Sequence, residues 1–397
     1  MNSTSIPRLD IDPFSDAVLQ DPYGYHEQLR EAGPVFWLES LGVYGMARFD
    51  EVRASLSNHE VFVSSRGVGV ADFAKEEPWR PPSLLLEADP PLHDRTRGIM
   101  SAILAPARLR EREPLWRERA HELVDELTES DSFDAVTDLA EVFPMRIFPD
   151  SVGLMDEGRE HLLTYAAAVF NAFGPRNHIF EEGNAASVDA SAWVAEACTR
   201  ENLKPGGWGQ DVFAAADRGE CTPDEAERLV RSLLSAGVDT TVNGIGHLLL
   251  AFTEHPREWD NLRADPRLIR RAVDESIRWD STVQTFFRTA SQDTEVAGHL
   301  IPKDSKVLLF LGSANRDPRK WDKPELFDLT RTTSGHVGFG AGIHQCLGQV
   351  IARLEAQMIV GALAERCVSI RRTAEPVRRL NNTLHALASL PVSVQLA

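Results

Sequence analysis

One continuous helical pattern constrains the fold of this chain more than any other feature. Residues 222–225 read Thr-Pro-Asp-Glu, a capping box with proline at the first helical position. The 3.6-residue apolar period then continues from residue 229 past residue 250. About thirty residues at ~1.5 Å each predict a rod roughly 45 Å long, which has to cross the whole molecule. Polar residues in its middle, 237–243, are then expected to be buried, where an unpartnered polar group costs free energy.

Most of the remaining chain also follows the helical period. Helices are predicted over residues 115–127, 161–173, 268–279 and 349–363. No repeat, low-complexity tract or flexible linker divides the sequence, so residues 1–397 are expected to form a single domain.

Short apolar runs mark a smaller β portion. Residues 35–38 and 43–47 predict a hairpin around a glycine-containing turn, and residues 392–396 alternate as a further strand. A second strand pair is predicted from residues 294–300 and 306–311, turning at Pro302 and Asp304. The fold class is therefore mainly α with a smaller β portion.

The charge of the chain limits its partners. It contains 42 Lys and Arg against 60 Asp and Glu, a formal net charge of −18. Phosphate backbones and anionic membrane surfaces repel such a protein, so neither nucleic acid nor a membrane is expected as a partner. The first residues lack the basic and apolar regions of a signal peptide, and no run of 18 uncharged apolar residues occurs, so a cytoplasmic location is expected. The four cysteines form no C-x-x-C pair, which argues against disulfides and structural zinc.

The segment 339–348, FGAGIHQCLG, places Cys346 in a glycine-rich turn just ahead of a predicted helix. A helix N-terminus lowers a thiol pKa through its dipole and free N–H groups, and glycines let backbone amides approach the sulfur. The turn therefore predicts a thiolate. A buried structural thiol, a nucleophile and a metal ligand all remain compatible with the cysteine alone.

This segment resembles the haem-binding loop of the cytochrome P450 oxygenases, F-G-x-G-x-H-x-C-x-G, at every fixed position. The resemblance implies a P450-like fold with the long central helix crossing the haem, and Cys346 as the axial thiolate of the haem b iron. By the same resemblance His344 contacts a haem propionate and Phe339 shields the sulfur.

Three further motifs, all N-terminal to the cysteine loop, occur in the same order as in that family. Glu275 and Arg278 resemble its E-x-x-R pair. The resemblance implies that they form, with Arg331, a buried structural triad that supports the haem loop. Without the resemblance, the pair would be interpreted as a surface ion pair. Cationic residues expected to hold the propionates are His93, Arg97 and Arg288.

The segment 236–241, AGVDTT, resembles the oxygen-activation signature of the family. Reduction of O2 consumes protons, so Thr240 is expected to hold a hydroxyl beside the oxygen and Asp239 to relay protons from solvent, with Gly237 loosening the helix. The alternative is that Thr240 only bonds back to the carbonyl one turn earlier.

Helix geometry suggests the size of the substrate. Ser232, Ala236 and Thr240 recur every four residues and form one stripe about 12 Å long, the length of one substituted aromatic ring. With Arg231 beside Ser232 at the far end, the stripe predicts a small aromatic acid.

Other segments resemble a bacterial subgroup of the family that oxidises para-substituted benzoates such as 4-methoxybenzoate: residues 79–91, 169–175 and 283–289. The resemblance implies that Arg80, Ser83 and Ser232 bind the carboxylate, with Arg231 nearby. It also implies that an apolar set holds the ring: Leu86, Phe170, Phe173, Ala236, Val283 and Phe286. The alternative for each phenylalanine is ordinary core packing. The alternative for Arg80 is an ion pair with Glu76 or Glu77 on the surface.

The predicted reaction is monooxygenation, most specifically the oxidative O-demethylation of 4-methoxybenzoate or a related hydroxylation. The chain has no flavin or iron–sulfur module, so the resemblance implies electrons from NAD(P)H through a flavoprotein reductase and a [2Fe-2S] ferredoxin. A basic docking patch is predicted at Arg108, Arg110 and Arg112. The alternatives are a P450 for another small aromatic substrate of phenol or cinnamate type, a non-catalytic haem sensor, and a hydrolase that uses Cys346 and His344. The loop 66–82 is a plausible lid.

Overall fold

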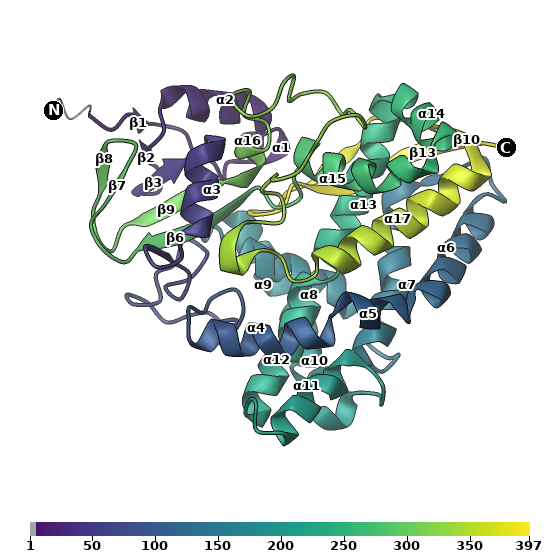
Figure 1. The fold of residues 1–397 in the computed structure, drawn as a ribbon, viewed down its shortest axis with the longest axis horizontal. Coiled ribbons are helices and arrows are strands. Elements are labelled where there is room, and N and C mark those ends of the chain that lie inside the picture. The colour runs from purple at the N-terminus through teal and green to yellow at the C-terminus, as the bar shows by residue number, and fades with distance from the viewer. Residues whose placement is uncertain (1–4) are drawn as a thin grey trace.

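The amphipathic segments of the sequence form helices that pack around a central pair, α12 and α13 (Figure 1). The large sheet lies on the left of the molecule in this view, and β10 and β13 lie on the right, near the C-terminus. The computed structural model describes residues 5–397, with 49% of the chain in helices and 14% in strands. The predicted mainly α fold with a smaller β portion is confirmed.

The helices are numbered in chain order. Their bounds are α1 (Asp16–Gln20), α2 (Tyr23–Ala32), α3 (Phe49–Ser57), α4 (Leu92–Ile103), α5 (Pro106–Arg110), α6 (Glu113–Leu127), α7 (Val142–Val152), α8 (His161–Asn171), α9 (His178–Ala186), α10 (Val188–Ala197), α11 (Trp208–Asp217), α12 (Pro223–Ala236), α13 (Asp239–Glu254), α14 (Pro256–Ala264), α15 (Ile269–Trp279), α16 (Leu311–Ala314) and α17 (Gln349–Arg366). Short 3-10 and π turns are η1 (Ala135–Ala140), η2 (Arg200–Asn202), η3 (Pro266–Leu268) and η4 (Gly342–His344).

The strands form one sheet of six and three smaller ones. Their bounds are β1 (Arg8–Leu9), β2 (Phe36–Leu38), β3 (Val43–Met46), β4 (Phe62–Val63), β5 (Ser132–Asp134), β6 (Thr285–Ala290), β7 (Thr294–Val296), β8 (His299–Ile301), β9 (Lys306–Phe310), β10 (Cys367–Arg372), β11 (Val377–Arg379), β12 (Ala386–Ser389) and β13 (Pro391–Leu396). The large sheet has the order β1-β2-β3-β9-β6-β4, and the others are β10-β13-β5, β11-β12 and β7-β8.

The first predicted hairpin is confirmed, because β2 and β3 pair antiparallel with Trp37 opposite Tyr44. The second predicted pair is wrong. Ala297 and Gly298 both have positive φ, the conformation of a two-residue hairpin turn, so β7 reverses directly into β8. Strand β9 instead lies fully buried between β3 and β6, as its unbroken apolar character allows.

The central helix is interrupted rather than continuous. The capping box at Thr222 and Glu225 is confirmed, but α12 ends at Ala236 and α13 starts at Asp239. Val238 has φ −105° and ψ −67°, outside the ideal helix. Gly237 is required there because a Cβ would lie 2.3 Å from Cζ of Phe148. The predicted single rod is therefore wrong in detail, and the break exposes backbone groups toward the cavity described below.

The largest hydrophobic core surrounds α13, which contacts α8, α14, α15 and α17. Two smaller clusters pack on the two sides of the large sheet. No helix within residues 5–397 is long and apolar enough to cross a membrane.

Candidate active site

A cavity lies between the break of the central helix and the loop that precedes α17. Its volume is about 270 Å³. Most of the side chains predicted for the site line this cavity: Arg80, Ser83, Leu86, Arg97, Phe170, Phe173, Ser232, Ala236, Thr240, Val283, Phe286, Arg288, Phe339, His344 and Cys346. Six predicted residues lie outside the lining: His93, Arg231, Asp239 and the three of the predicted structural triad, Glu275, Arg278 and Arg331.

Cys346 lies in a tight loop between η4 and α17. Its N–H donates to the carbonyl oxygen of Phe339 at 2.8 Å. Gly340 and Gly342 have φ of +71° and +70°, which glycine adopts without steric cost. A Cβ on Gly342 would also lie 2.8 Å from the carbonyl oxygen of Leu56, so α3 closes over the loop. The loop thereby holds the cysteine against the cavity.

The thiol pKa differs from the prediction. Burial raises the pKa of Cys346, and the amides of Gly348 and Gln349 and the guanidinium of Arg97 oppose that rise only in part. The prediction of a lowered thiol pKa is wrong for the polypeptide by itself. A metal cation on the sulfur deprotonates a coordinating thiol outright, so the site suits a metal ligand better than a free nucleophile.

Two histidines with unused ring nitrogens lie at one edge of the cavity. The rings of His93 and His344 are 4.5 Å apart, and both side chains are buried. Within residues 5–397, neither Nε2 atom has a hydrogen-bond partner. Asp89 approaches Nε2 of His344 only to 3.9 Å, which is too long for a hydrogen bond. These nitrogens are therefore free to bond a group inside the cavity.

Two arginines complete the same edge. Arg288 is 3% exposed, and its Nη1 donates to the carbonyl oxygen of Phe287 at 2.8 Å. Burial lowers the pKa of Arg288 to about 10, so the guanidinium stays charged at neutral pH. Arg97 donates from Nη2 to the carbonyl oxygen of Gln345 at 2.6 Å. The buried Arg288, the half-buried Arg97 and two unpartnered histidine nitrogens fit a dianionic edge such as the haem propionates, with Cys346 facing the metal.

The break in the central helix carries a buried carboxylate. Asp239 is fully buried, and its Oδ1 accepts from Arg379 Nη2 at 2.7 Å and Asn243 Nδ2 at 3.0 Å. Its Oδ2 has no partner within the described chain. Burial raises the pKa of Asp239, although Arg379 opposes this rise. A carboxyl with a raised pKa, one free oxygen and a half-exposed arginine partner is suited to moving protons between solvent and the cavity.

Thr240 both lines the cavity and bonds back to the preceding helical turn, so the two alternatives for its hydroxyl are compatible. It lines the cavity, and its hydroxyl donates to the carbonyl oxygen of Ala236 at 2.8 Å. Thr241 makes the same bond to Gly237 at 3.2 Å. Since the hydrogen of Thr240 is used in this bond, its hydroxyl oxygen is left to accept from a group in the cavity.

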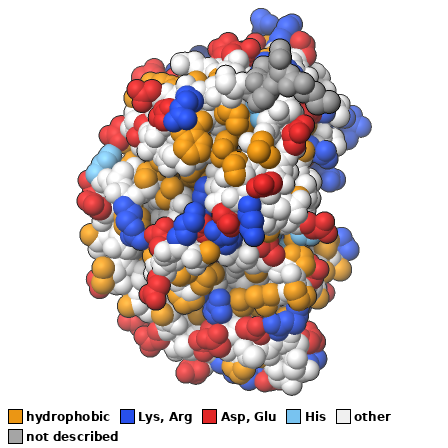
Figure 2. All heavy atoms as spheres, turned by 90° about the vertical axis from the view of Figure 1, so that its left-hand side faces the viewer, with side chains coloured by type: hydrophobic (Ala, Val, Ile, Leu, Met, Phe, Trp, Pro, Cys, Tyr) orange, Lys and Arg blue, Asp and Glu red, His pale blue; other side chains and the backbone are white. Residues whose placement is uncertain are grey.

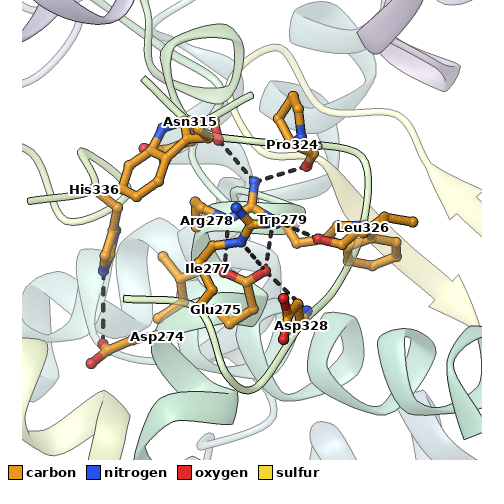
Figure 3. Close-up of polar contacts among 12 residues, drawn as sticks. Asp274, Glu275, Ile277, Arg278, Trp279, Asn315, Pro324, Leu326, Asp328 and His336 are labelled. Atoms are coloured by element: carbon orange, nitrogen blue, oxygen red, sulfur yellow. Dashed lines mark hydrogen bonds and ion pairs between the residues drawn. The ribbon is translucent and has the colours of Figure 1, made fainter. Parts of the chain in front are cut away.

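A buried ion-pair cluster lies behind the cysteine loop (Figure 3). Glu275 pairs with Arg278 through two hydrogen bonds of 2.7 and 2.8 Å, and both side chains are fully buried. Arg331 donates from Nε to the same carboxylate at 3.0 Å. The guanidinium of Arg278 also donates to the carbonyl oxygens of Asn315, Pro324 and Leu326. The cluster thus ties α15 to the chain segment that leads into the cysteine loop.

One end of the cavity, between α12 and the loop before α4, is polar. Ser83 Oγ lies 3.3 Å from Ser232 Oγ. Arg80 pairs with Glu87 at 3.1 Å and stacks on Trp79, 5.2 Å from the ring centroid.

Two contacts at this end differ from those considered for the sequence. Glu76 and Glu77 are exposed, and the carboxylate that Arg80 meets is Glu87 instead. Arg231 does not line the cavity, because its Nη2 turns outward to the carbonyl oxygen of Pro81 at 3.3 Å. Residues three or four apart share a helix face, whereas Arg231 directly precedes Ser232 and points elsewhere.

Aromatic rings form the walls of the cavity. Phe173 packs edge-on against Phe170 and Phe286, with centroids 5.8 and 5.9 Å apart. All three rings line the cavity and also pack in the hydrophobic core. Core packing and contact with a substrate are therefore compatible for these phenylalanines. Leu86 and Val283 add apolar surface. The walls favour a flat apolar ring.

Sequence reasoning missed three partners. Glu87 follows Ser83 by four residues, and this spacing is the one local signal, that of a helical turn, for its contact. Arg379 reaches Asp239 across 140 positions, and Phe148 reaches Gly237 from α7, so no local pattern could have found either contact.

The arginines predicted for a docking patch are partly occupied. Arg108 pairs with Asp211 at 2.5 Å, and Arg112 donates to the carbonyl oxygen of Gly206 at 2.9 Å and stacks on Trp208. Only Arg110 of the three is exposed without such a contact in the part of the chain that the structure describes. These residues do not make a cluster of free positive charges.

Known proteins with similar sequences and structures match this arrangement. A family model described as cytochrome P450 matches residues 210–396. Cytochrome P450 CYP199A2 of Rhodopseudomonas palustris is 52% identical over 394 residues, covering 99% of this chain and 96% of that protein. The solved structure of CYP109Q5 from Chondromyces apiculatus has a TM-score of 0.82 at 30% identity and covers 98% and 99% of the two chains. The cytochrome P450 CREJ, solved in complex with (4-ethylphenyl) dihydrogen phosphate, has a TM-score of 0.86 at 26% identity and covers 97% and 99%.

The match therefore extends over nearly the full length of both sequences, and it includes the loop that holds Cys346. The cysteine facing the cavity, the cationic edge and the interrupted central helix all agree with it. This chain belongs to the cytochrome P450 family of haem-thiolate monooxygenases.

Proposed function

We propose that this monooxygenase oxidises a small aromatic acid at its para substituent, with the O-demethylation of 4-methoxybenzoate as the leading reaction. The observation that carries the proposal is the polarity of the cavity. Hydroxyls and a guanidinium from Ser83, Ser232 and Arg80 gather in one part of the lining, which also contains Cys346 and the rings of three phenylalanines. Such a cavity orients a ring with a polar head group and an apolar tail.

A structural relative supports this size and polarity. CREJ was solved with (4-ethylphenyl) dihydrogen phosphate, a benzene ring that carries an anionic group para to an alkyl group. A carboxylate para to a methoxy group has the same arrangement on a smaller scale.

When bound, the haem supplies the activation of O2 and the insertion of one oxygen atom into a C–H bond of the substrate. The residues proposed to hold it are Cys346 at the metal, His93, Arg97, Arg288 and His344 at the propionates, and Phe339 beside the sulfur. The cluster of Glu275, Arg278 and Arg331 is proposed to hold the loop in place.

The remaining roles belong to binding, orientation and proton movement. Arg80, Ser83 and Ser232 hold the carboxylate, while Leu86, Phe170, Phe173, Ala236, Val283 and Phe286 exclude water around the ring. The ring is then fixed with its para group toward Cys346, and selectivity follows from position rather than from acid–base contact with the substrate. Asp239 delivers protons through its free Oδ2, and Thr240 accepts a hydrogen bond in the cavity.

Hydroxylation of a methoxy carbon gives a hemiacetal, which splits into a phenol and formaldehyde with no further oxidant. The two electrons for each turnover are proposed to come from NAD(P)H through a flavoprotein reductase and a [2Fe-2S] ferredoxin.

A binding titration tests the proposal. Ferric holoenzyme is titrated with 4-methoxybenzoate and with 4-methoxytoluene, which has the same ring and methoxy group but no head group, while the Soret band is followed. Saturable binding of the acid that is at least tenfold tighter than that of the toluene supports the proposal. Equal affinity for the two compounds contradicts it.

A further inference from the structure

Strand β9 carries a buried lysine that does not line the cavity and that the proposed reaction does not use. Lys306 is the first residue of the strand and is 8% exposed. Its Nζ donates hydrogen bonds to the carbonyl oxygens of Arg66, Gly67 and Gly69 at 3.1, 2.8 and 3.0 Å. An ammonium group has three hydrogens, so the backbone of one short segment uses all of them.

Segment 66–73 closes around this ammonium group. The N–H of Phe73 donates to the carbonyl oxygen of Arg66 at 3.1 Å. The side chain of Arg66 donates from Nε and Nη2 to the two carboxylate oxygens of Asp72, each at 2.6 Å. Gly67 has a φ of +91°, which glycine adopts without steric cost. Loss of the ammonium group would leave buried carbonyl oxygens of the segment without the donor that now satisfies them.

The segment packs on the wall of the cavity from outside. The N–H of Val70 donates to the carbonyl oxygen of Phe173 at 2.8 Å, and the N–H of Phe287 donates to the carbonyl oxygen of Val68 at 2.9 Å. A Cβ on Gly69 would lie 2.7 Å from Cα of Phe173, so the two backbones are in contact. Phe173 lines the cavity, whereas none of the segment's described residues does. The position of Phe173 therefore depends on a segment that a ligand in the cavity does not touch.

We propose that Lys306 is a positioning residue for the cavity, because it fixes segment 66–73 and, through that segment, Phe173. The ring of Phe173 packs edge-on against Phe170 and Phe286, so its displacement disturbs all three rings of the aromatic wall. A substrate ring that is held less closely reaches the reactive position less often, which lowers the product formed for each NADH consumed. The inference rests on the proposed function in one respect, since it takes these rings as the site of the substrate ring.

The substitution Lys306→Met removes the ammonium group and keeps an unbranched side chain. Lys303→Met is the matched control, because it makes the same change at an exposed position three residues earlier. Burial lowers the pKa of Lys306 to about 7, so measurements on holoenzyme at pH 6 keep the wild-type ammonium group charged.

Hydrogen exchange of backbone amides, followed by mass spectrometry, tests the link without turnover. In K306M the amides of segment 66–73 are expected to exchange at least about tenfold faster than in the wild type, and those of residues 169–175, around Phe173, at least about threefold faster. In K303M neither segment should change. In the wild type, saturating 4-methoxybenzoate is expected to slow the exchange of segment 66–73 at least about threefold, because coupling between the wall and the segment acts in both directions.

Binding and turnover give the second comparison. In K306M the dissociation constant of 4-methoxybenzoate is expected to rise about five- to tenfold, and the 4-hydroxybenzoate formed for each NADH consumed to fall at least about twofold. A purely structural role would lower the unfolding temperature and leave the product formed for each NADH unchanged.

Two results overturn the role of Lys306. One is a folded K306M in which the exchange of residues 169–175 and the product formed for each NADH are those of the wild type. The other is a wild-type protein that binds 4-methoxybenzoate with no change in the exchange of segment 66–73, which is readable even if K306M does not fold. A wild-type protein that does not bind 4-methoxybenzoate contradicts the proposed function instead, and the exchange of residues 169–175 in K306M then still decides the role of Lys306.

Discussion

Two hydroxyls at the head-group end of the cavity differ in what they are free to do. Ser83 Oγ already accepts two backbone N–H groups, so its hydrogen is available for Ser232 or for a ligand. Ser232 uses its own hydrogen in a 2.9 Å bond to the carbonyl oxygen of Arg228, one turn earlier in α12. A carboxylate therefore gains a donor from Ser83 at little cost, whereas Ser232 has to break a bond first.

This difference predicts an order of effects on 4-methoxybenzoate binding. Ser83→Ala is expected to weaken binding by about tenfold, the value of one hydrogen bond to a charged group, and Ser232→Ala by less than about threefold. The dissociation constant of 4-methoxytoluene is the control, because loss of the turn at Ser83 would weaken both ligands alike. A larger loss in S232A than in S83A contradicts the assignment of the donors.

A second residue with an unusual environment is Glu355 on α17. Its side chain is fully buried, and neither carboxylate oxygen has a partner within residues 5–397. Burial raises the pKa of Glu355 from 4.5 to about 8. Between these values the folded protein holds a proton that the unfolded chain has lost, so this group lowers the free energy of unfolding as the pH rises.

Glu355→Gln removes that titration while keeping a neutral side chain of the same shape. The free energy of unfolding of E355Q relative to wild type is expected to rise by about 3 kcal/mol more at pH 8 than at pH 5.5. Chemical denaturation of the holoenzyme at the two pH values measures it. Glu365→Gln, at an exposed position of the same helix, should show no such change. Equal gains at both pH values would mean that the folded-state pKa is ordinary.

At the scale of the elements, local patterns were predictable and distant pairings were not. The β2–β3 hairpin and the ten-residue cysteine loop are each specified within one short segment, and both lie where expected. The wrong strand pair failed because β9 joins β3 and β6, which are far apart in the sequence. The apolar period also runs unbroken through residues 236–239, so it could not reveal the break in the central helix.

The break depends on close contact with a neighbouring helix. A Cβ at Gly237 would lie 2.3 Å from the ring of Phe148 and 2.8 Å from the carbonyl oxygen of Leu233. Gly237→Ala is therefore expected to lower the free energy of unfolding by about 1–3 kcal/mol, the usual range for overpacking. Gly361→Ala, where a Cβ meets open space inside α17, is expected to be neutral or stabilising. Thermal unfolding of both variants decides this, and an unaffected G237A would contradict the close packing.

At the scale of the whole molecule, the ion-pair cluster at Glu275 links the helical core to the loop of the proposed haem ligand. Glu275→Gln leaves Arg278 buried with its charge unpaired, which is expected to lower the free energy of unfolding by about 3–5 kcal/mol. Glu375→Gln, at an exposed ion pair, is the control and should change nothing measurable. Haem retention is the second readout. Normal stability with lost haem would show that the cluster acts on the loop alone.

The net charge of −18 does not mean that every surface region is acidic. Figure 2 shows basic side chains in a band across the middle of one face, mixed with acidic ones, and patches of apolar side chains above and below. Arg108 and Arg112 are engaged within the chain. If an acidic redox partner binds this protein, we therefore expect it to contact other basic side chains on the surface.

Product analysis tests most simply whether the cavity fixes an aromatic acid by its head group and oxidises its para substituent. Holoenzyme with a surrogate ferredoxin, its reductase and NADH is given 4-methoxybenzoate or 3-methoxybenzoate, and the phenolic product and formaldehyde are quantified against NADH consumed. We expect 4-hydroxybenzoate and formaldehyde in equal amounts from the para isomer, and at least tenfold less product from the meta isomer, whose methoxy group is not para to the carboxylate. Equal turnover of the two isomers, or none of either, would contradict a cavity that fixes an aromatic acid by its head group.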